Sequence, residues 1–380
     1  MNKEMQPPLI SIFVPTKNRY TYLEKLISLI EGYKDSRIEL IIHDNSDSNV
    51  EILRYLNTMD LLSTKYYYYQ GYLTMSENST KAFQYCRGEY VCMIGDDDAV
   101  CRNIAECAEW MKANGVDSLR STNLHFDYGN SGPHLLYWED ISPTYSILDP
   151  QKELKIALKN GLVDFGNISK PYHGILKREV LQKVFEIGGT CFPGCTPDMS
   201  GAVSSCFFVK KMAKVNIPVI IPAASPVDSG GLAGQILSLE EVPWISQNVR
   251  DNWERKIPRI WAREFIWPES GSKGLRYTGH DDMFKYFNYN MTYCRYILMH
   301  KQHRKEVIQF APNKFLLLAA LFKTICMVGI KKIVNRSLMS RITGKLNGKY
   351  NFSYNCRDLS DVVSYFSDIN TYPFSELKLK

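Results

Sequence analysis

The chain has 380 residues, with 46 Lys and Arg against 40 Asp and Glu, so its formal net charge is +6. This length suits one large domain with an extension or two domains, and the apolar content of 45% excludes a disordered chain. Residues 300–350 hold eleven Lys and Arg against one acid, so the basic charge belongs to a late segment and not to the whole surface.

The ten cysteines are scattered and include no CxxC pair. Cys191 and Cys195 have the spacing closest to that of a metal-binding pair, but we expect reduced thiols, as in a cytoplasmic protein. The first apolar run is short, follows two prolines and ends at Pro15, which does not fit a secretory signal. We therefore expect a cytoplasmic location.

Apolar strands alternate with helices in the first hundred residues. Strands are expected at 9–14, 38–44, 65–69 and 89–95. Helices are expected after an N-cap at Thr21 that is followed by Glu24, after the turn at 45–49, at 77–86, and around 104–111. This alternation predicts an α/β fold whose mostly parallel sheet is covered by helices on both faces.

The pattern weakens after residue 120. A strand is expected at 118–126, helices at 151–163, within 172–185 and in the small-residue stretch after 196, and a strand at 215–222. The main domain boundary is expected near residue 235. The first domain would then have a donor half at about 9–126 and an acceptor half at about 127–235, followed by a helical, basic C-terminal region at 236–380.

Polar segments follow three of the expected strands. They read "PTKNR" from Pro15, "DNSDS" from Asp44 and "DDD" at 96–98. Ligands of such sheets bind beyond the carboxyl ends of the strands, so we expect the three segments to meet at one edge.

Three consecutive aspartates at the end of an apolar strand repel one another unless a cation lies among them. If the strand continues through them, Asp96 and Asp98 share a face and Asp97 points away. Two carboxylates suit Mg²⁺ or Mn²⁺ when the remaining ligands are phosphate oxygens and water. The alternative is a solvated acidic turn that caps the next helix.

Three stretches in this order, "SIFVPTKNR", "IELIIHDNSDS" and "GEYVCMIGDDD", resemble glycosyltransferase family 2. Two later stretches, "PYHGILKREVL" and "FPGCTPDMSGAV", resemble its members that build bacterial surface polysaccharides. The resemblance covers residues 9–100 well and 170–231 more loosely. It implies a nucleotide-binding GT-A fold and transfer of a hexosyl or related glycosyl group.

The resemblance also implies roles for particular residues. Pro15 and Thr16 would lie against the nucleotide, and Asp44 would bond to its base or ribose, unless Asp44 only caps a turn or helix. Asp96 and Asp98 would hold the cation on the diphosphate.

Other residues are further candidates for contacts with the metal or the nucleotide. Asp97 is a rival for either metal role, because families differ in which aspartate touches the ion. Family members often begin the helix before the fourth strand with an Arg-Asn pair; here the arginine is missing, and Asn78 stands in the asparagine position. Arg19 and Lys17 are either phosphate contacts or solvated cations.

An inverting sugar transfer needs a carboxylate that takes the proton of the acceptor hydroxyl. Asp198 is our choice, because it begins a helix whose N-terminus favours the ionised form and whose small residues would leave room for a sugar. Related transferases carry a similar Pro-Asp, although a helix cap is the alternative. The carboxylates between 120 and 235 that could act as this base are Glu139, Asp140, Asp164, Glu179, Glu186 and Asp198.

His173 and the loop at 228–231 each allow two interpretations. His173 would contact phosphate or acceptor, or be satisfied by a backbone carbonyl. The "DSGG" at 228–231 is either a loop that closes over the donor or a linker.

The basic tail includes an apolar stretch at 314–334 that lysines interrupt, which makes it a poor transmembrane helix. It is either a helix on an anionic membrane surface, within about 300–350, or a helix that packs inside the protein. In the first case the acceptor would be a lipid-linked saccharide at the cytosolic face. No nucleic-acid-binding motif is present.

The sequence thus predicts a metal-dependent, inverting glycosyltransferase with Mn²⁺ or Mg²⁺, a nucleotide-sugar donor and a saccharide or lipid-linked acceptor, acting in O-antigen or capsule synthesis. One alternative is a non-catalytic scaffold subunit of a polysaccharide complex. Another is a sugar-phosphate nucleotidyltransferase, although the loop after the first strand lacks the glycines of that class. The sequence does not specify the sugar, the nucleotide or the oligomeric state.

Overall fold

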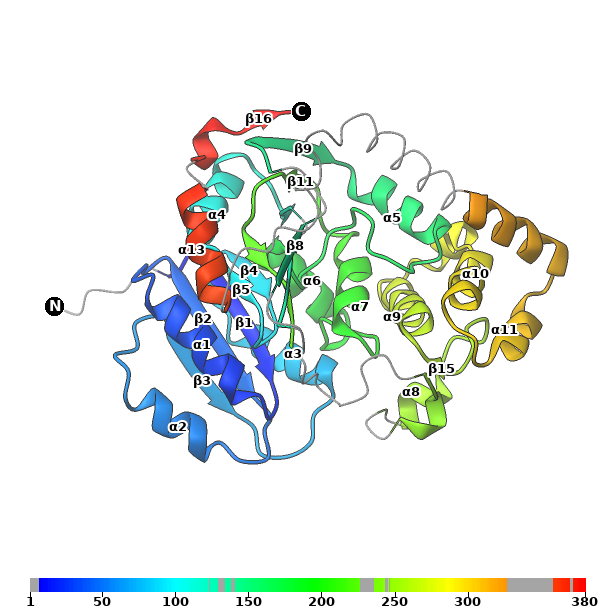
Figure 1. Cartoon of the computed structure of the whole chain (residues 1–380), viewed down its shortest axis with the longest axis horizontal. Coiled ribbons are helices and arrows are strands. Elements are labelled where there is room, and N and C mark those ends of the chain that lie inside the picture. The colour runs from blue at the N-terminus through cyan, green and yellow to red at the C-terminus, as the bar shows by residue number, and fades with distance from the viewer. Residues whose placement is uncertain are drawn as a thin grey trace.

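The computed structural model describes residues 7–122, 124–128, 134–137, 141–225, 236–242, 245, 247–326, 358–369 and 372–380. A nine-stranded sheet forms the centre of this part of the chain (Figure 1). In spatial order its strands are β16 (Lys378–Leu379), β9 (Thr144–Leu148), β11 (Met212–Val215), β6 (Ser118–Arg120), β10 (Ile175–Lys177), β4 (Tyr90–Met93), β1 (Ile10–Thr16), β2 (Ile38–Asp44) and β3 (Thr64–Tyr68).

Strand β1 lies between β2 and β4 and runs parallel to both, with Val14 opposite Ile42 and Phe13 opposite Met93. Strand β3 continues the parallel array beyond β2, whereas β10 pairs antiparallel with both β4 and β6. The expected α/β fold with a mostly parallel central sheet is confirmed.

Side-chain alternation along β1 divides the core into two layers. Ile10, Ile12 and Val14 pack on one face and Phe13 on the other, because successive side chains of a strand point to opposite sides. The first face is covered by α1 (Tyr20–Glu31), α2 (Val50–Leu56) and α4 (Ile104–Ala113), and the second by α3 (Met75–Gln84) and α6 (Arg178–Gly188).

The expected helix starts at Thr21 and at residue 77 are wrong. Helix α1 begins at Tyr20 after Arg19, and no side chain caps it. The Tyr20 hydroxyl donates to Asp44 Oδ2 (2.7 Å) and to the Ser48 carbonyl, which ties the start of α1 to the end of β2. Helix α3 begins at Met75, because Thr74 and Glu77 form the capping box there.

Shorter elements replace two strands that were expected to be continuous. The stretch 118–126 forms β6 and, separately, β7 (Leu124–Asp127), which pairs with β8 (His134–Tyr137) and β13 (Ala223–Ala224). The stretch 215–222 forms the end of β11 and then β12 (Ile220–Ile221), which pairs with β5 (Ala99–Val100). Strands β5 and β13 flank the turn that holds Asp96, Asp97 and Asp98.

Helices from both sides of the expected boundary near 235 share one core cluster. Leu158 of α5 (Pro150–Lys159), Val203 of α7 (Pro197–Ser205) and Leu275 of α9 (Arg263–Tyr277) belong to it. The helices approach closely because glycines lie between them: a Cβ on Gly271 would collide with Leu162 Cδ1. The first-domain helix α7 therefore packs against the C-terminal region.

The remaining described elements are mostly helical, and two of them return to the N-terminal sheet. A second cluster joins α10 and α11 with a helix over residues 314–326. Near the chain end, Val362 of α13 packs against Ile221, and β16 pairs parallel to β9 (Figure 1). The bounds are β14 (Leu237–Ser238), η1 (Leu239–Glu241), α8 (Gln247–Asp251), β15 (Ile260–Trp261), η2 (Asp281–Tyr286), α10 (Tyr289–Met299), α11 (Arg304–Phe310), α13 (Leu359–Ile369) and η3 (Phe374–Glu376).

A search of the described helices for a membrane-crossing segment, long and apolar enough to span a bilayer, finds none.

Candidate active site at the sheet edge

The polar segments after β1, β2 and β4 meet at one edge of the sheet, as predicted. Thr16 Oγ1, at the end of β1, donates to Asp96 Oδ2 (2.6 Å) in the loop after β4. The Thr16 carbonyl accepts from the backbone N–H of Asn45 (3.0 Å), which follows β2. Three loops that are distant in sequence are thus joined by direct hydrogen bonds.

The three aspartates lie in a turn and not on a strand, because β4 ends at Met93. Gly95 makes this acidic turn possible, since a Cβ there would lie 2.9 Å from Asp97 Oδ1. Asp96 and Asp97 both contact one cation, whereas Asp98 points to other partners. The rule of alternating faces, on which the expected pairing of Asp96 with Asp98 rested, therefore does not apply to this turn.

The cation between Asp96 and Asp97 is Arg19, the residue before α1. Its Nε lies 3.1 Å from Asp96 Oδ1 and its Nη2 lies 2.7 Å from Asp97 Oδ2, and only 12% of its side chain is exposed. Arg19 also donates to Ser225 Oγ, just after β13. Burial raises the pKa of Asp96 to about 7, although the Arg19 charge opposes this shift.

Both oxygens of Asp98 accept hydrogen bonds within the protein. Oδ1 accepts from the backbone N–H of Ala223 (2.7 Å), and Oδ2 accepts from that of Gly95 (2.6 Å) and lies 2.7 Å from His173 Nε2. Burial opposes ionisation, but His173 and these backbone donors hold the pKa of Asp98 below its ordinary value. The ring of His173 thus has a carboxylate partner, and not the backbone carbonyl of the alternative interpretation.

Asp44 is completely buried at the end of β2. Its Oδ2 accepts from the hydroxyls of Tyr20 (2.7 Å) and Tyr66 (2.5 Å), and its Oδ1 accepts from the backbone N–H of Ser46 (2.8 Å). The side chain therefore forms the turn that the alternative interpretation expected. Its contact with a nucleotide stays a prediction.

Asn78 joins α3 to the ends of β1 and β2. Its Nδ2 donates to the Thr16 carbonyl (3.2 Å), and its Oδ1 lies 2.5 Å from His43 Nδ1. Pro15, beside Thr16, is partly buried, while Lys17 is exposed, with its ammonium 5.4 Å from the centroid of the Tyr72 ring. Lys17 therefore lies outside the carboxylate cluster, as its solvated interpretation predicted.

Asp198 lies in the first turn of α7, where its Oδ1 accepts from the backbone N–H of Met199 (2.8 Å). Burial raises the pKa of Asp198, and Met199, Lys170 and His173 partly oppose the shift. The charges of Lys170 and His173 thus connect this carboxylate electrostatically with the acidic turn.

The electrostatic environment of Tyr172 includes both Asp198 and the acidic turn. Burial raises the pKa of Tyr172, and the charges of Asp98, Asp97, Asp198 and Asp96 raise it further. Its hydroxyl also lies 3.4 Å from Asp98 Oδ2. The negative charges of four carboxylates from two parts of the chain thus raise the pKa of one phenol.

The other candidate bases lie elsewhere or outside the described residues. Asp164, Glu179 and Glu186 are exposed. Asp164 accepts from the backbone N–H of Gly166, and Glu179 pairs with Lys177 and Lys183. Glu139, Asp140 and the 228–231 loop lie outside the described residues.

Comparison with known families gives one match, in the N-terminal half of the chain. Residues 11–185 match the family model described as Glycosyl transferase family 2. Residues 11–185, called the family 2 domain below, are thus similar to glycosyl transferase family 2. The match includes Thr16, Arg19, Asp44 and the acidic turn, and it ends before Asp198. No curated protein sequence matches the chain significantly.

Solved structures give distant likenesses to the family 2 domain and its surroundings. S. aureus TarS 1–349 in complex with UDP is 14% identical, with 57% of this chain and 61% of that chain covered and a TM-score of 0.41. The same protein in complex with UDP-GlcNAc is 12% identical, with 80% of this chain and 81% of that chain covered and a TM-score of 0.47. A mannosyltransferase from Pyrobaculum calidifontis, in complex with GDP-Man and Mn²⁺, is 14% identical, with 84% of this chain and 87% of that chain covered and a TM-score of 0.40. At these identities and TM-scores the likenesses carry no conclusion about this chain's substrate.

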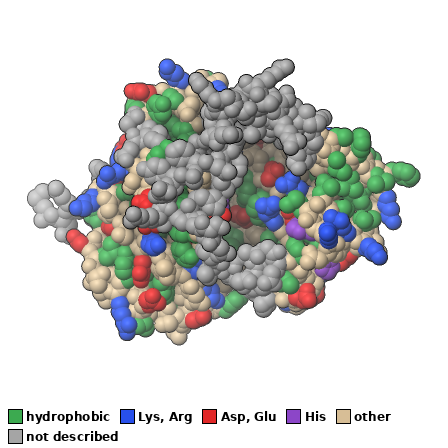
Figure 2. Space-filling model, in the orientation of Figure 1, with side chains coloured by type: hydrophobic (Ala, Val, Ile, Leu, Met, Phe, Trp, Pro, Cys, Tyr) green, Lys and Arg blue, Asp and Glu red, His purple; other side chains and the backbone are tan. Residues whose placement is uncertain are grey.

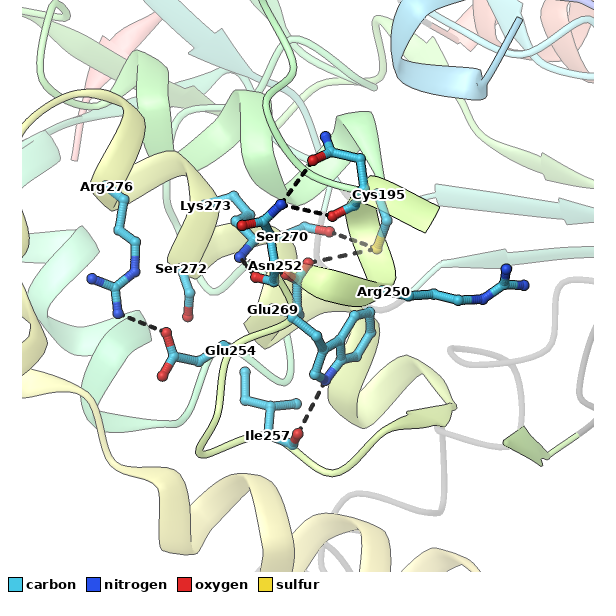
Figure 3. A network of polar contacts seen from close by, with 12 residues as sticks. Cys195, Arg250, Asn252, Glu254, Ile257, Glu269, Ser270, Ser272, Lys273 and Arg276 are labelled. Carbon is cyan, nitrogen blue, oxygen red and sulfur yellow. Dashed lines mark hydrogen bonds and ion pairs between the residues drawn. The ribbon is translucent and has the colours of Figure 1, made fainter. Parts of the chain in front are cut away.

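Asp198 is placed by contacts with α9, outside the stretch that matches family 2. Ser270 Oγ accepts from the backbone N–H of Thr196 (3.0 Å) and lies 3.2 Å from Cys195 Sγ (Figure 3). The small residues Ser200 and Ser204 of α7 are completely buried. The expectation that small residues leave room for a sugar is wrong, because this part of α7 packs against α9.

The side chains of Cys191 and Cys195 face different helices. Cys191 is buried against α6, where its Sγ donates to the Leu181 carbonyl (3.8 Å), while Cys195 faces α9. Within the described residues no group of His, Cys, Asp and Glu has the arrangement of a metal site, and the nine cysteines found there are free.

The sequence interpretation missed two residues beside His173. Tyr172 is one; Lys170 is the other, and its pKa is lowered to about 7 by burial and by Arg120, while Asp198 and Asp98 oppose the shift. Both belong to the segment "KPYHG", of which only the histidine was a predicted site residue.

A cavity of about 580 Å³ borders the acidic turn of the family 2 domain. Its walls include Asp96, Asp98 and Tyr22, together with residues of α13. A larger cavity, of about 770 Å³, lies between α4 and the chain end, away from these carboxylates. Of these two cavities, the smaller one therefore gives access to the carboxylate cluster.

Proposed function

We propose that the protein transfers a sugar from a nucleotide-sugar donor to an acceptor hydroxyl with inversion at the anomeric carbon. The observation that carries this proposal is the meeting of the loops after β1 and β4 at one sheet edge, where Thr16 donates to Asp96 and Arg19 pairs with Asp96 and Asp97. A cation site for a diphosphate would then lie at this edge. The family 2 domain supports this assignment.

The acidic turn fits a divalent cation such as Mn²⁺ or Mg²⁺, because it offers hard carboxylate oxygens. Asp96 Oδ1 is buried and accepts no well-aligned hydrogen bond; Arg19 Nε lies 3.1 Å from it. The sequence pairs Asp96 with Asp98, but the geometry favours Asp97 as the second ligand, because both oxygens of Asp98 already accept hydrogen bonds. When bound, the cation would stabilise negative charge on the departing diphosphate.

The protein's own residues would supply the remaining functions. Asp198 would accept the proton of the acceptor hydroxyl, and its raised pKa makes it a stronger base than an ordinary aspartate. Thr16 and Pro15 would border the nucleotide, and Arg19 would pair with its phosphates. Inversion follows when the acceptor oxygen attacks from the side opposite to the leaving diphosphate.

For the pathway we propose O-antigen or capsule synthesis in the cytoplasm, with a saccharide or a lipid-linked saccharide as acceptor. This part rests on the resemblance of "FPGCTPDMSGAV" and "PYHGILKREVL" to transferases of bacterial surface polysaccharides. A nucleotidyltransferase is less favoured, because the loop at 15–19 contains no glycine. A non-catalytic scaffold would bind the nucleotide without turnover.

The first experiment incubates the protein with UDP-, GDP-, dTDP- and CMP-sugars and Mn²⁺, and measures nucleotide release with and without saccharide acceptors. We expect turnover with one nucleotide class. Nucleotide binding without turnover for every donor and acceptor would favour the scaffold, and release of pyrophosphate from a nucleoside triphosphate and a sugar phosphate would favour the nucleotidyltransferase.

The second experiment uses Asp198→Asn. Loss of a general base typically lowers turnover by about 10²- to 10⁴-fold, and nucleotide affinity should stay near the wild-type value. Glu186→Gln, an exposed carboxylate on α6, is the matched control. Equal turnover of Asp198→Asn and the control would contradict the assignment of the base.

A further inference from the structure

The helix over residues 314–326 has apolar side chains on two opposite faces. Leu317 is 3% exposed and packs in the cluster that contains Val307 and Tyr296, so one face is a packing face. Phe315 and Phe322, by contrast, are 84% and 71% exposed. The packing-helix interpretation of this stretch therefore accounts for only half of its hydrophobic surface.

Four of the exposed apolar residues form a continuous stripe. Phe315, Leu318, Phe322 and Ile325 are spaced i, i+3, i+7 and i+10, and each is at least half exposed. At about 100° per residue these positions lie within about 80° of one another on the helix surface. Figure 2 shows hydrophobic side chains gathered at the right-hand end of the molecule, where Figure 1 draws this helix.

Lysines border the stripe on both sides. By the same helical geometry, Lys314 lies about 100° to one side of Phe315 and Lys323 about 80° to the other, and both are exposed. Residues 300–326 hold five Lys and Arg against the single acid Glu306. The lysine stems can lie along an apolar surface while their ammonium groups reach anionic groups at its boundary.

We propose that this stripe, defined as Phe315, Leu318, Phe322 and Ile325, docks on an anionic lipid surface with the helix lying in the plane of the interface. Apolar side chains flanked by lysines match acyl chains below a layer of anionic headgroups. The lysines at both borders favour a bilayer over a second copy of the chain, whose identical positive charges would meet there. Docking does not depend on the proposed transferase activity; a lipid-linked acceptor follows only if both hold.

The test is flotation of the full chain with vesicles of phosphatidylcholine alone or phosphatidylcholine mixed with phosphatidylglycerol. We expect the wild type to float with the mixed vesicles, and added salt to weaken the binding. The double substitution Phe315→Ser with Phe322→Ser should lower partitioning about tenfold or more, because two large apolar side chains no longer enter the bilayer. Lys314→Glu with Lys323→Glu should remove the preference for anionic lipid.

The control is Leu62→Ser with Ile187→Ser, which removes two other exposed apolar side chains, 62% and 46% exposed, and should float like the wild type. Near-UV circular dichroism checks that each variant is folded. Equal flotation of the stripe variant and the wild type would overturn the proposal, as would equal binding to neutral vesicles. A dimer in light scattering that the stripe variant converts to monomer would assign the stripe to a second copy instead.

Discussion

Arg19 occupies the position between Asp96 and Asp97 where a divalent cation would bind. It neutralises two buried carboxylates that would otherwise repel each other, and its contact with Ser225 holds the end of β13 beside them. A cation entering between these aspartates would have to displace the guanidinium, which would then be free to pair with a diphosphate. Arginine and metal would thus compete for the same oxygens.

Arg19→Met should therefore bind Mn²⁺ more tightly than the wild type in the absence of nucleotide. We expect a gain of about tenfold or more, because the competing charge is gone and the two carboxylates remain. The electron paramagnetic resonance signal of free Mn²⁺ measures this directly. Arg37→Met, which removes a surface arginine paired with Asp35, is the control; unchanged or weaker Mn²⁺ binding by Arg19→Met would contradict the competition.

At the scale of single residues, the sequence predicted which side chains meet but not how they pair. Thr16, Arg19 and the acidic turn were predicted to meet because residues that follow parallel strands share an edge, whereas His173 was a predicted site residue by resemblance alone. The choice of Asp96 and Asp98 as metal ligands stays a prediction, but its strand argument fails: the strand ends at Met93, so the rule of alternating faces does not apply to Asp96–Asp98. Lys170 and Tyr172 were missed because their pKa shifts come from neighbours distant in sequence.

At the scale of elements, the contact between α7 and α9 includes a buried charged group. Glu269 of α9 is fully buried and lies 3.2 Å from Lys273 Nζ, while Cys195, from the loop before α7, donates to it (3.8 Å; Figure 3). Burial raises the pKa of Glu269 to about 7, Lys273 and Cys195 oppose the shift, and Glu254 adds to it.

This carboxyl makes the stability of the protein depend on pH. Between about pH 4.5 and 7 the folded form keeps a proton that the unfolded form loses, so the free energy of unfolding falls as pH rises, by up to about 3 kcal/mol. Glu269→Gln cannot ionise, so its stability relative to the wild type should increase from pH 5 to pH 8 in urea unfolding. Glu240→Gln, at an exposed carboxylate, should show no such trend; the same flat trend for Glu269→Gln would contradict the assignment.

The sequence predicted the elements of the first hundred residues well, because each strand and helix there has its own apolar period. It failed at the small-residue helix α7, whose burial depends on a partner in α9, more than fifty residues later. Small side chains are compatible with an open pocket or with close helix packing. Only the presence of Gly271 and Gly274 on the opposite helix distinguishes the two.

At the scale of the whole molecule, the family 2 half and the region after 235 are joined by a shared core. Leu158 and Val203 pack with Leu275, and Phe287 belongs to the same cluster. A chain that ends at 235 would expose these side chains to water. The two parts of the proposed organisation therefore share one hydrophobic cluster.

A fragment of residues 1–235 should accordingly be unstable. We expect little near-UV circular dichroism and no cooperative urea transition, because the cluster that contains α5 and α7 loses the partners supplied by α9 and η2. The full chain is the reference. A fragment with a cooperative transition at the midpoint of the full chain would show that the first 235 residues fold on their own.

The return of α13 and β16 to the N-terminal sheet has a kinetic consequence. Strand β16 pairs with β9 across more than two hundred residues of chain, and Phe374 packs in the cluster that contains Ile10 and Ile12. Contacts of such high sequence separation form slowly, because a long loop must close before they add stability. During synthesis, the sheet that carries the acidic turn would thus remain open at its β9 edge until residue 379 has left the ribosome.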